Sequence, residues 1–332
     1  MKRATAMIMA LLLMAGALSG CGSEGESRPA DGEKKTKSIV ATIFPQYDWV
    51  RNILGDNPAG IELTLFLDKG VDLHSFQPTA DDILALSDCD LLIYVGGESD
   101  AWVDKALAEA GNPEVRTVNL LEALGDGARE EEVVEGMQEE DEDDEEEDGP
   151  EYDEHVWLSL RNAQKLVEVI ADAVAETDAE NAALYRKNAE AYNGKLADLD
   201  ARYARAVEQS SAKTLLFGDR FPFRYMTEDY GLDYYAAFVG CSAETEASFE
   251  TIAFLAGKVD ELGLSCVMTI EGSDHRIAET IIANTASKDQ QILTMDSLQS
   301  VTGAAVEEGA DYLAMMEKNL TVLEEALKGG TK

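Results

Sequence analysis

Short apolar segments alternate with helical patterns in two separate blocks of the chain, and this alternation constrains the fold more than any other feature. In the first block, strands are predicted at 38–43, 61–67, 91–95 and 116–119, and helices at 45–54, 79–86 and 102–110. In the second block, strands are predicted at 214–218, 234–239, 266–270 and 291–294, and helices at 223–229, 245–262, 276–287 and 311–328. Short apolar strands between helices indicate a parallel sheet that is covered on both faces. The sequence therefore predicts an α/β fold with two parallel-sheet lobes.

A long helical pattern separates the two blocks. A helix is predicted at 160–177, and the sequence Thr177-Asp178-Ala179-Glu180 fits a capping box that begins a second helix. Apolar residues then recur at spacings of four and three, at Tyr185, Ala189, Tyr192, Leu196, Leu199, Tyr203 and Ala206. About 30 residues at about 1.5 Å each make a rod of roughly 45 Å. We therefore predict a single long rigid helix, 177–210, that joins an N-terminal lobe (38–176) to a C-terminal lobe (211–330). A coiled-coil dimer is the alternative use of the stripe.

The first residues have the pattern of a lipoprotein signal. Lys2 and Arg3 precede an uncharged apolar stretch, 4–18, which is too short for a permanent membrane-spanning helix. The stretch ends in Leu18-Ser19-Gly20-Cys21, which resembles the lipobox of bacterial lipoproteins. We therefore expect 1–20 to be a signal peptide, Cys21 to be lipidated, and 21–37 to be a flexible tether of an extracytoplasmic protein anchored to the cell membrane. An ordinary secretory signal is the alternative.

Negative charge is concentrated in one segment. The chain has 27 Lys and Arg against 66 Asp and Glu, a net charge of −39, which disfavours a nucleic-acid partner. Between Glu130 and Glu154, 17 of 25 residues are acidic. Self-repulsion in such a run predicts a disordered acidic loop, 129–154, inserted into the N-terminal lobe. The loop would collect cations weakly, or serve only as a solvated spacer.

The three histidines of the chain occur where parallel-sheet folds bind ligands. His74 follows the strand at 61–67 and His275 follows the strand at 266–270, while His155 comes directly after the acidic run. In such folds, ligands bind beyond the carboxyl ends of the strands. Imidazole, completed by carboxylates, is a preferred ligand of zinc. The chain contains no H-E-x-x-H, C-x-x-C or EF-hand sequence, so we predict a metal site that the fold assembles in the cleft between the lobes.

Two of the histidines lie in motifs of a known family. The segment 70–79, Gly-Val-Asp-Leu-His-Ser-Phe-Gln-Pro-Thr, and the segment 153–159, Asp-Glu-His-Val-Trp-Leu-Ser, resemble the first and second ligand motifs of metal-specific solute-binding lipoproteins. These proteins serve zinc and manganese ABC importers (the zinc-uptake type of cluster A-I). The resemblance covers nearly everything from Ser38 to Leu327. It implies a metal-ligand role for His74 and His155.

The third and fourth motifs depart from the family pattern. Arg220 stands where the resemblance implies a third ligand, and a guanidinium cannot coordinate a metal. The neighbouring Asp219 is one replacement, or Arg220 could pair with a carboxylate such as Glu271 or Glu246. Asp274 is the counterpart of the family's carboxylate ligand. We expect the adjacent His275 to compensate for the lost third ligand.

The predicted ligand set is therefore His74, His155 and His275 with one of Asp274, Asp219 or Glu271. Three imidazoles and one carboxylate suit tetrahedral Zn²⁺ better than Mn²⁺. The resemblance implies a monomeric, high-affinity zinc-binding protein that delivers the metal to an ABC permease and is not an enzyme. The alternatives are a manganese- or iron-binding member of the family, an extracytoplasmic metalloenzyme, and an adhesion or interaction lipoprotein with a structural metal.

Three cysteines remain besides Cys21, and an odd number cannot all pair. Cys241 follows one predicted strand and Cys266 begins the next, which puts them at opposite ends of a parallel sheet. We predict buried free thiols rather than a disulfide between these two residues.

Overall fold

Two parallel sheets of four strands each form the centres of two lobes. The computed structural model describes residues 36–138, 151–242 and 246–328. The first sheet has the order β2-β1-β3-β4, made of β1 (Ser38–Ala41), β2 (Glu62–Leu65), β3 (Leu91–Tyr94) and β4 (Arg116–Asn119). The second has the order β6-β5-β7-β8, made of β5 (Thr214–Phe221), β6 (Asp233–Val239), β7 (Cys266–Ile270) and β8 (Gln291–Met295). All neighbouring strands are parallel. The two-lobed α/β prediction is confirmed.

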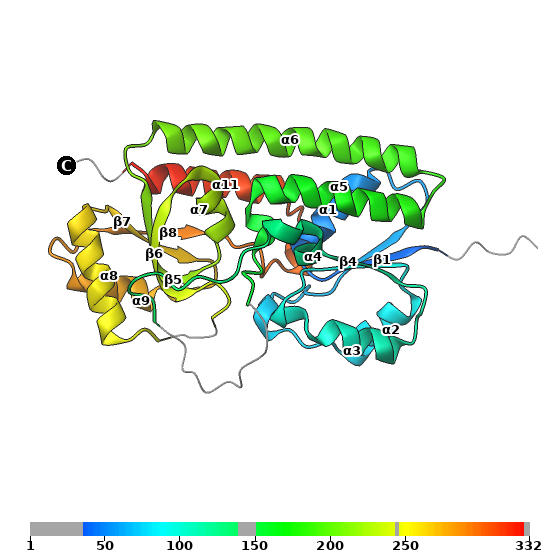
Figure 1. Cartoon of the computed structure of the whole chain (residues 1–332), viewed down its shortest axis with the longest axis horizontal. Helices are drawn as coiled ribbons and strands as arrows, with labels where there is room; N and C mark the ends of the chain where they lie inside the picture. Colours follow the sequence, from blue (N-terminus) through cyan, green and yellow to red (C-terminus); the bar gives the residue numbers. More distant parts are fainter. Residues whose placement is uncertain (1–35, 139–150, 243–245, 329–332) are drawn as a thin grey trace, which may run out of the picture. The chain divides into compact units, whose positions relative to one another are not determined.

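Helices connect the strands and cover the sheets (Figure 1). Those of the N-terminal lobe are α1 (Phe44–Leu54), α2 (Ala80–Asp88), α3 (Trp102–Ala110) and α4 (Leu120–Leu124), followed by α5 (Leu160–Thr177) and α6 (Ala182–Gln209). Those of the C-terminal lobe are α7 (Arg224–Tyr230), α8 (Phe249–Leu262), α9 (Arg276–Asn284), α10 (Gly303–Glu307) and α11 (Tyr312–Ala326). The central strand β7 is buried along its whole length, as expected for a parallel strand that has helices on both faces.

The long helix α6 starts later than the capping-box pattern predicts. Thr177 is the last residue of α5, and its Oγ1 donates to the Ala173 carbonyl oxygen at 2.9 Å instead of capping a new helix. Asp178 Oδ2 accepts hydrogen bonds from Asn181 Nδ2 and Tyr185 Oη, both at 2.7 Å, and α6 begins after Asn181. The capping-box prediction is wrong because the threonine hydroxyl is already used inside the preceding helix.

Helix α6 joins the two lobes by contacts on both. Its 28 residues give a length of about 42 Å at about 1.5 Å per residue. Asn188 Nδ2 donates to the Ile53 carbonyl of α1 at 2.9 Å, and Tyr203 Oη donates to the Met316 carbonyl of α11 at 2.6 Å. Figure 1 shows α6 running beside α5 and α11. The apolar stripe is buried within the same chain, so the coiled-coil dimer is not needed to cover it.

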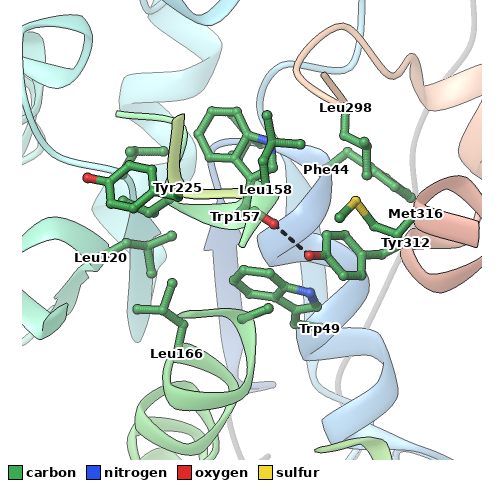
Figure 2. Packing of buried hydrophobic residues seen from close by; sticks show 14 of the residues in the cluster. Phe44, Trp49, Leu120, Trp157, Leu158, Leu166, Tyr225, Leu298, Tyr312 and Met316 are labelled. Atoms are coloured by element: carbon green, nitrogen blue, oxygen red, sulfur yellow. Dashed lines mark hydrogen bonds between the residues drawn. The ribbon is translucent and has the colours of Figure 1, made fainter. Parts of the chain in front are cut away.

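Trp157 is buried where the two lobes meet. Its indole Nε1 donates to the Ser297 carbonyl at 2.8 Å, and its own carbonyl accepts from Tyr312 Oη of α11 at 2.5 Å. The Tyr312 ring in turn meets the Trp49 ring of α1 edge-on, with centroids 5.4 Å apart. Figure 2 shows these aromatic side chains packed together. Trp157, Tyr312 and Trp49 are fully buried, so this cluster holds the elements that carry the candidate site.

Some predictions fall on parts of the chain outside the described residues. The signal peptide 1–20, the lipidated Cys21 and the tether up to residue 35 belong to these parts, and Thr36–Lys332 forms one compact unit by itself. In the described ranges, no helix has the length and apolarity needed to cross a membrane. Cys89, Cys241 and Cys266 are free thiols, which confirms the prediction that Cys241 and Cys266 do not pair.

Candidate metal centre

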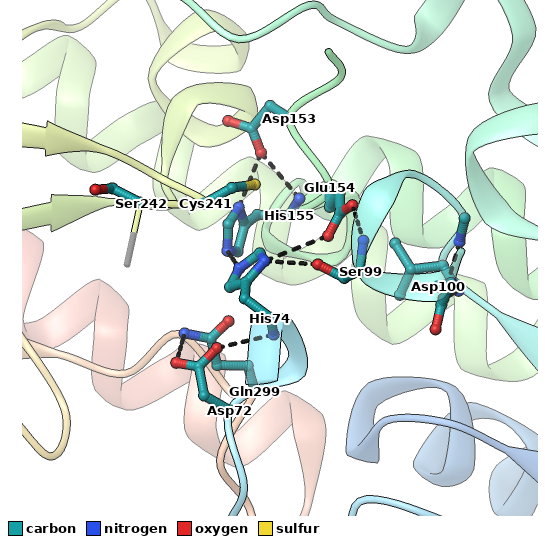
Figure 3. A network of polar contacts seen from close by, with 12 residues as sticks. Asp72, His74, Ser99, Asp100, Asp153, Glu154, His155, Cys241, Ser242 and Gln299 are labelled. Atoms are coloured by element: carbon teal, nitrogen blue, oxygen red, sulfur yellow. Dashed lines mark hydrogen bonds and ion pairs between the residues drawn. The ribbon is translucent and has the colours of Figure 1, made fainter. Parts of the chain in front are cut away.

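Three side chains with metal-binding atoms converge from three segments that lie far apart in the sequence. His74 lies in a short 3-10 turn (Leu73–Ser75) after β2, His155 precedes the turn Val156–Leu158, and Cys241 follows β6. The two Nε2 atoms of His74 and His155 are 3.3 Å apart. One ring nitrogen of each histidine and the Cys241 Sγ lie within 4.8 Å of one another. Figure 3 shows the cluster.

Both imidazoles are held at their Nδ1 atoms. His155 Nδ1 lies 3.0 Å from Asp153 Oδ1, and a carboxylate can only accept, so this nitrogen carries a hydrogen. His74 Nδ1 lies 2.7 Å from Ser99 Oγ and 3.5 Å from Glu154 Oε2, which favours the same tautomer. The Nε2 lone pairs therefore face each other. A proton or a metal ion between the two Nε2 atoms would relieve the repulsion of these lone pairs.

Burial and the surrounding carboxylates shift the protonation of the cluster. Burial, with the neighbouring His155, lowers the pKa of His74 to about 3. Burial opposes the charged form of His155, but the hydrogen bond and charge of Asp153 outweigh it and raise the pKa of that imidazole. Burial raises the pKa of Glu154 to about 7. Burial, with Glu131 next, raises the pKa of the Cys241 thiol well above its usual value. These opposite shifts favour His155 over His74 as the imidazole that holds a proton.

Two glycines leave room for the side chains of this centre. Gly240 has no Cβ, and one placed there would lie 3.1 Å from His155 Cε1 and 3.0 Å from the Phe221 carbonyl oxygen. Gly97 has φ +76°, and a Cβ there would lie 2.3 Å from Glu154 Oε1. Glycine is the residue that permits both the left-handed backbone and the close approach.

The two ends of the acidic insert are packed against the centre. Residues 129–138 and 151–154 are described, and Glu130 pairs with Tyr152 in an antiparallel bridge. Glu131 Oε1 accepts from the Cys241 backbone N–H at 3.0 Å, while the Asp153 side chain holds His155. The predicted disordered loop over 129–154 is therefore wrong at both ends, because these residues bond to the ligand-bearing segments. Residues 139–150 lie outside the described part of the chain.

Arg220 pairs with neither of the predicted carboxylates, Glu271 and Glu246. Its Nη2 donates to Asp72 Oδ2 at 2.7 Å, and its Nη1 lies 3.3 Å from the Ser242 carbonyl oxygen. Asp72 Oδ1 in turn accepts from the backbone N–H of His74 at 3.1 Å. The arginine thus bonds beside His74 in one lobe and beside Cys241 in the other.

Two of the predicted carboxylate ligands are used inside the C-terminal lobe. Asp219 accepts from the Arg220 N–H at 2.9 Å and from the Ile270 N–H at 3.2 Å, which ties β5 to β7. Glu271 accepts from the N–H and the hydroxyl of Ser297, at 2.7 and 2.5 Å, which ties the loop after β7 to the loop after β8. Neither is in the group of donor atoms around His74 and His155.

The predicted pair Asp274 and His275 is also separate from this group. Gly272, with φ +74°, turns the chain after β7, and His275 follows in the left-handed region (φ 62°) as the residue before α9. Asp274 is exposed and forms an ion pair with Arg276. The structure does not bring His275 into this group, because the turn places it directly before α9.

Cys241 is the member of the group that sequence reasoning classed only as a free thiol. Its position carried a usable signal, because it is the second residue after the strand β6. The carboxyl ends of parallel strands share one edge of the sheet, which is the edge that also carries the loops of the binding site.

Comparison with known proteins identifies the family. The family model described as zinc-uptake complex component A, periplasmic, matches residues 39–326. The zinc-binding lipoprotein AdcA of Streptococcus pneumoniae is 31% identical over 305 residues, which are 90% of this chain and 56% of that protein. The chain thus spans little more than half of that relative. The high-affinity zinc uptake system protein ZnuA of Bacillus subtilis is 28% identical over 312 residues, 93% of each chain.

The fold agrees with a solved structure of such a relative. The crystal structure of the Zn(II)-bound ZnuA-like domain of Streptococcus pneumoniae AdcA superposes with a TM-score of 0.67. It is 26% identical and covers 88% of this chain and 99% of that one. The family model matches residues 39–326, which include both lobes and the histidine pair. The chain therefore belongs to the ZnuA family of zinc-uptake components.

Proposed function

We propose that the protein is an extracytoplasmic, lipid-anchored protein that captures Zn²⁺ with high affinity and delivers it to an ABC permease. His74 and His155 are the first two ligands, one from the loop after β2 and one from the segment before α5. The zinc named in the relatives' descriptions supports this metal.

The single observation that carries the proposal is the geometry of the histidine pair. Zn–N bonds of about 2.0–2.1 Å at tetrahedral angles put two ligand nitrogens about 3.3 Å apart. The Nε2 atoms of His74 and His155 are separated by 3.3 Å. Carboxylate or hydroxyl partners at the other ring nitrogen fix the tautomer of each ligand, as they do in zinc proteins generally. The pair is therefore already arranged as one edge of a zinc tetrahedron.

The carboxylates near the centre support a binding role rather than catalysis. A metalloenzyme needs a general base beside an open coordination position. Asp153 and Glu154 contact the two imidazoles, while Asp219 and Glu271 are hydrogen-bonded within the C-terminal lobe. We expect no hydrolytic activity. The negative charges around the histidines would also attract a divalent cation.

The anchoring and delivery steps rest on the sequence and on the family. Cys21 lies in the lipobox-like segment, so acylation there would hold the protein at the membrane. An ABC permease is the partner that a zinc-uptake component requires. The net charge of −39 argues against a nucleic-acid partner, and we expect a monomer.

Calorimetric titration tests this function directly. Protein beginning at Gly22, which contains the whole compact unit Thr36–Lys332, is stripped of metal and titrated with Zn²⁺ and then with Mn²⁺. We expect one tight zinc site and at least about 100-fold weaker manganese binding, since nitrogen-rich sites follow the Irving–Williams order. The proposal is abandoned if no first-row metal binds tightly, and the manganese alternative is favoured if Mn²⁺ binds more tightly than Zn²⁺.

Asp153 should matter for zinc binding although it does not touch the metal. Replacing it by alanine removes the acceptor that orients His155 Nδ1, and such outer-shell changes cost about 10–100-fold in metal affinity. Asp274→Ala is the matched control, because that carboxylate is exposed and pairs with Arg276. Competition with a chromophoric chelator measures both variants. Equal affinities for the two would contradict the assigned role of Asp153.

A further inference from the structure

We infer that the Cys241 thiolate is the third zinc ligand, and that it makes the centre selective for zinc over manganese. This inference rests on the proposed function. It goes further because it assigns a third ligand in place of the one that the family pattern has at the position of Arg220. The thiol loses its proton to solvent as the sulfur–zinc bond forms. The resulting His₂Cys set comes from loops of both lobes, because His74 follows β2 and Cys241 follows β6.

Distances within the group fit a tetrahedral zinc site after a small contraction. A Zn–S bond of about 2.3 Å and a Zn–N bond of about 2.0–2.1 Å put sulfur and nitrogen about 3.6 Å apart. In the structure the Cys241 Sγ and one ring nitrogen of each histidine lie within 4.8 Å of one another. Figure 3 shows the sulfur beside the His155 ring. The site would close to zinc geometry if the sulfur and the nitrogens approached one another by about an ångström.

Two neighbours hold Cys241 at this place. The Glu131 carboxylate accepts its backbone N–H at 3.0 Å. Arg220 Nη1 lies 3.3 Å from the carbonyl oxygen of the next residue, Ser242, while its Nη2 binds Asp72 beside His74. The guanidinium cannot coordinate a metal, but it forms hydrogen bonds to both the segment that carries His74 and the segment that carries Cys241. Arg220 is therefore a positioning residue for His74 and Cys241.

The chemistry of the sulfur predicts the selectivity. Thiolates favour zinc and softer cations, whereas manganese favours carboxylate and other oxygen ligands. A set of two imidazoles and one thiolate also leaves a fourth position of the tetrahedron for water or another ligand. A Cys241→Asp change would exchange the soft donor for a hard one at the same position.

The experiment uses the protein beginning at Gly22 with Cys241→Ser and Cys241→Asp, and Cys266→Ala as matched control. Cys266 is a buried free thiol at the start of β7, on a different element. We expect Cys241→Ser to lower zinc affinity by about 100-fold, because loss of a direct ligand should cost at least as much as the largest effect of a residue that only supports a ligand. Manganese affinity should change by less than about threefold. Cys241→Asp should reduce the ratio of zinc affinity to manganese affinity. Cys266→Ala should bind zinc like the wild type.

Cobalt substitution supplies a readout that depends on the sulfur itself. Wild type and Cys266→Ala loaded with Co²⁺ should show thiolate-to-cobalt charge-transfer absorption, and Cys241→Ser should lack it. Far-ultraviolet circular dichroism in chelator checks that the variants fold. The inference is overturned if the wild-type protein binds zinc tightly and two further results hold. Cys241→Ser would bind zinc as tightly as the wild type, and the cobalt spectrum of the wild type would lack the thiolate band. The proposed function itself fails only if wild-type protein does not bind zinc tightly.

Discussion

Replacement of His155 by alanine is expected to lower zinc affinity by about 60- to 700-fold. Structural zinc sites bind with apparent free energies of about 10–16 kcal/mol from four ligands, so one ligand contributes roughly 2.5–4 kcal/mol. Each 1.4 kcal/mol is about tenfold in affinity. The imidazole is fully buried, and its loss removes the ring donor 3.0 Å from the Asp153 carboxylate, which keeps the backbone N–H of residue 155 as a donor. The measurement is competition against chelators of graded strength.

His275→Ala is the matched control, because it removes the same side chain outside the donor group. We expect this variant to bind zinc within about threefold of the wild type, since no ligand is lost. The opposite pattern, with His275→Ala severely impaired and His155→Ala nearly normal, would refute the assigned pair. Thermal unfolding in chelator distinguishes a lost ligand from a lost fold.

Much of the fold could be predicted from local patterns. The strands Arg116–Asn119 and Cys266–Ile270 have the predicted bounds, because short apolar runs between turn residues leave few other structures. The start of α6 could not be read in the same way. Thr177 carries the capping sequence, but the choice between capping a new helix and bonding back to Ala173 depends on where α5 ends.

Residues of the candidate site could be predicted where they lie in a sequence motif. They could not be predicted where contacts between distant segments bring them to the site. His74 and His155 were singled out by their motifs, and the structure brings their Nε2 atoms to 3.3 Å. Cys241 is brought beside them by the end of β6 and by Glu131, which lies in a run predicted as disordered. The net charge of that run predicts only repulsion between its residues. Specific hydrogen bonds to backbone groups nevertheless stabilise its two ends.

Replacement of Trp157 by alanine is expected to destabilise the fold by about 3–5 kcal/mol, the range for a large aromatic side chain removed from a packed core. The side chain is fully buried, and its indole donates to the Ser297 carbonyl of the C-terminal lobe. Urea unfolding in the presence of chelator measures the change, because bound zinc would add its own stabilisation. A loss below about 1 kcal/mol would contradict the central position of Trp157.

Trp157→Phe separates packing from hydrogen bonding at this position. Phenylalanine keeps most of the buried ring but leaves the buried Ser297 carbonyl without the indole donor at 2.8 Å, which costs about 1–3 kcal/mol. The Ser297 N–H and hydroxyl are also bound by Glu271, so the loop after β8 should stay in place. We therefore expect Trp157→Phe to lose less stability than Trp157→Ala. Because the Trp157 ring contacts the His155 ring at a centroid distance of 5.2 Å, the alanine variant should also bind zinc more weakly, which links the interlobe core to the metal centre.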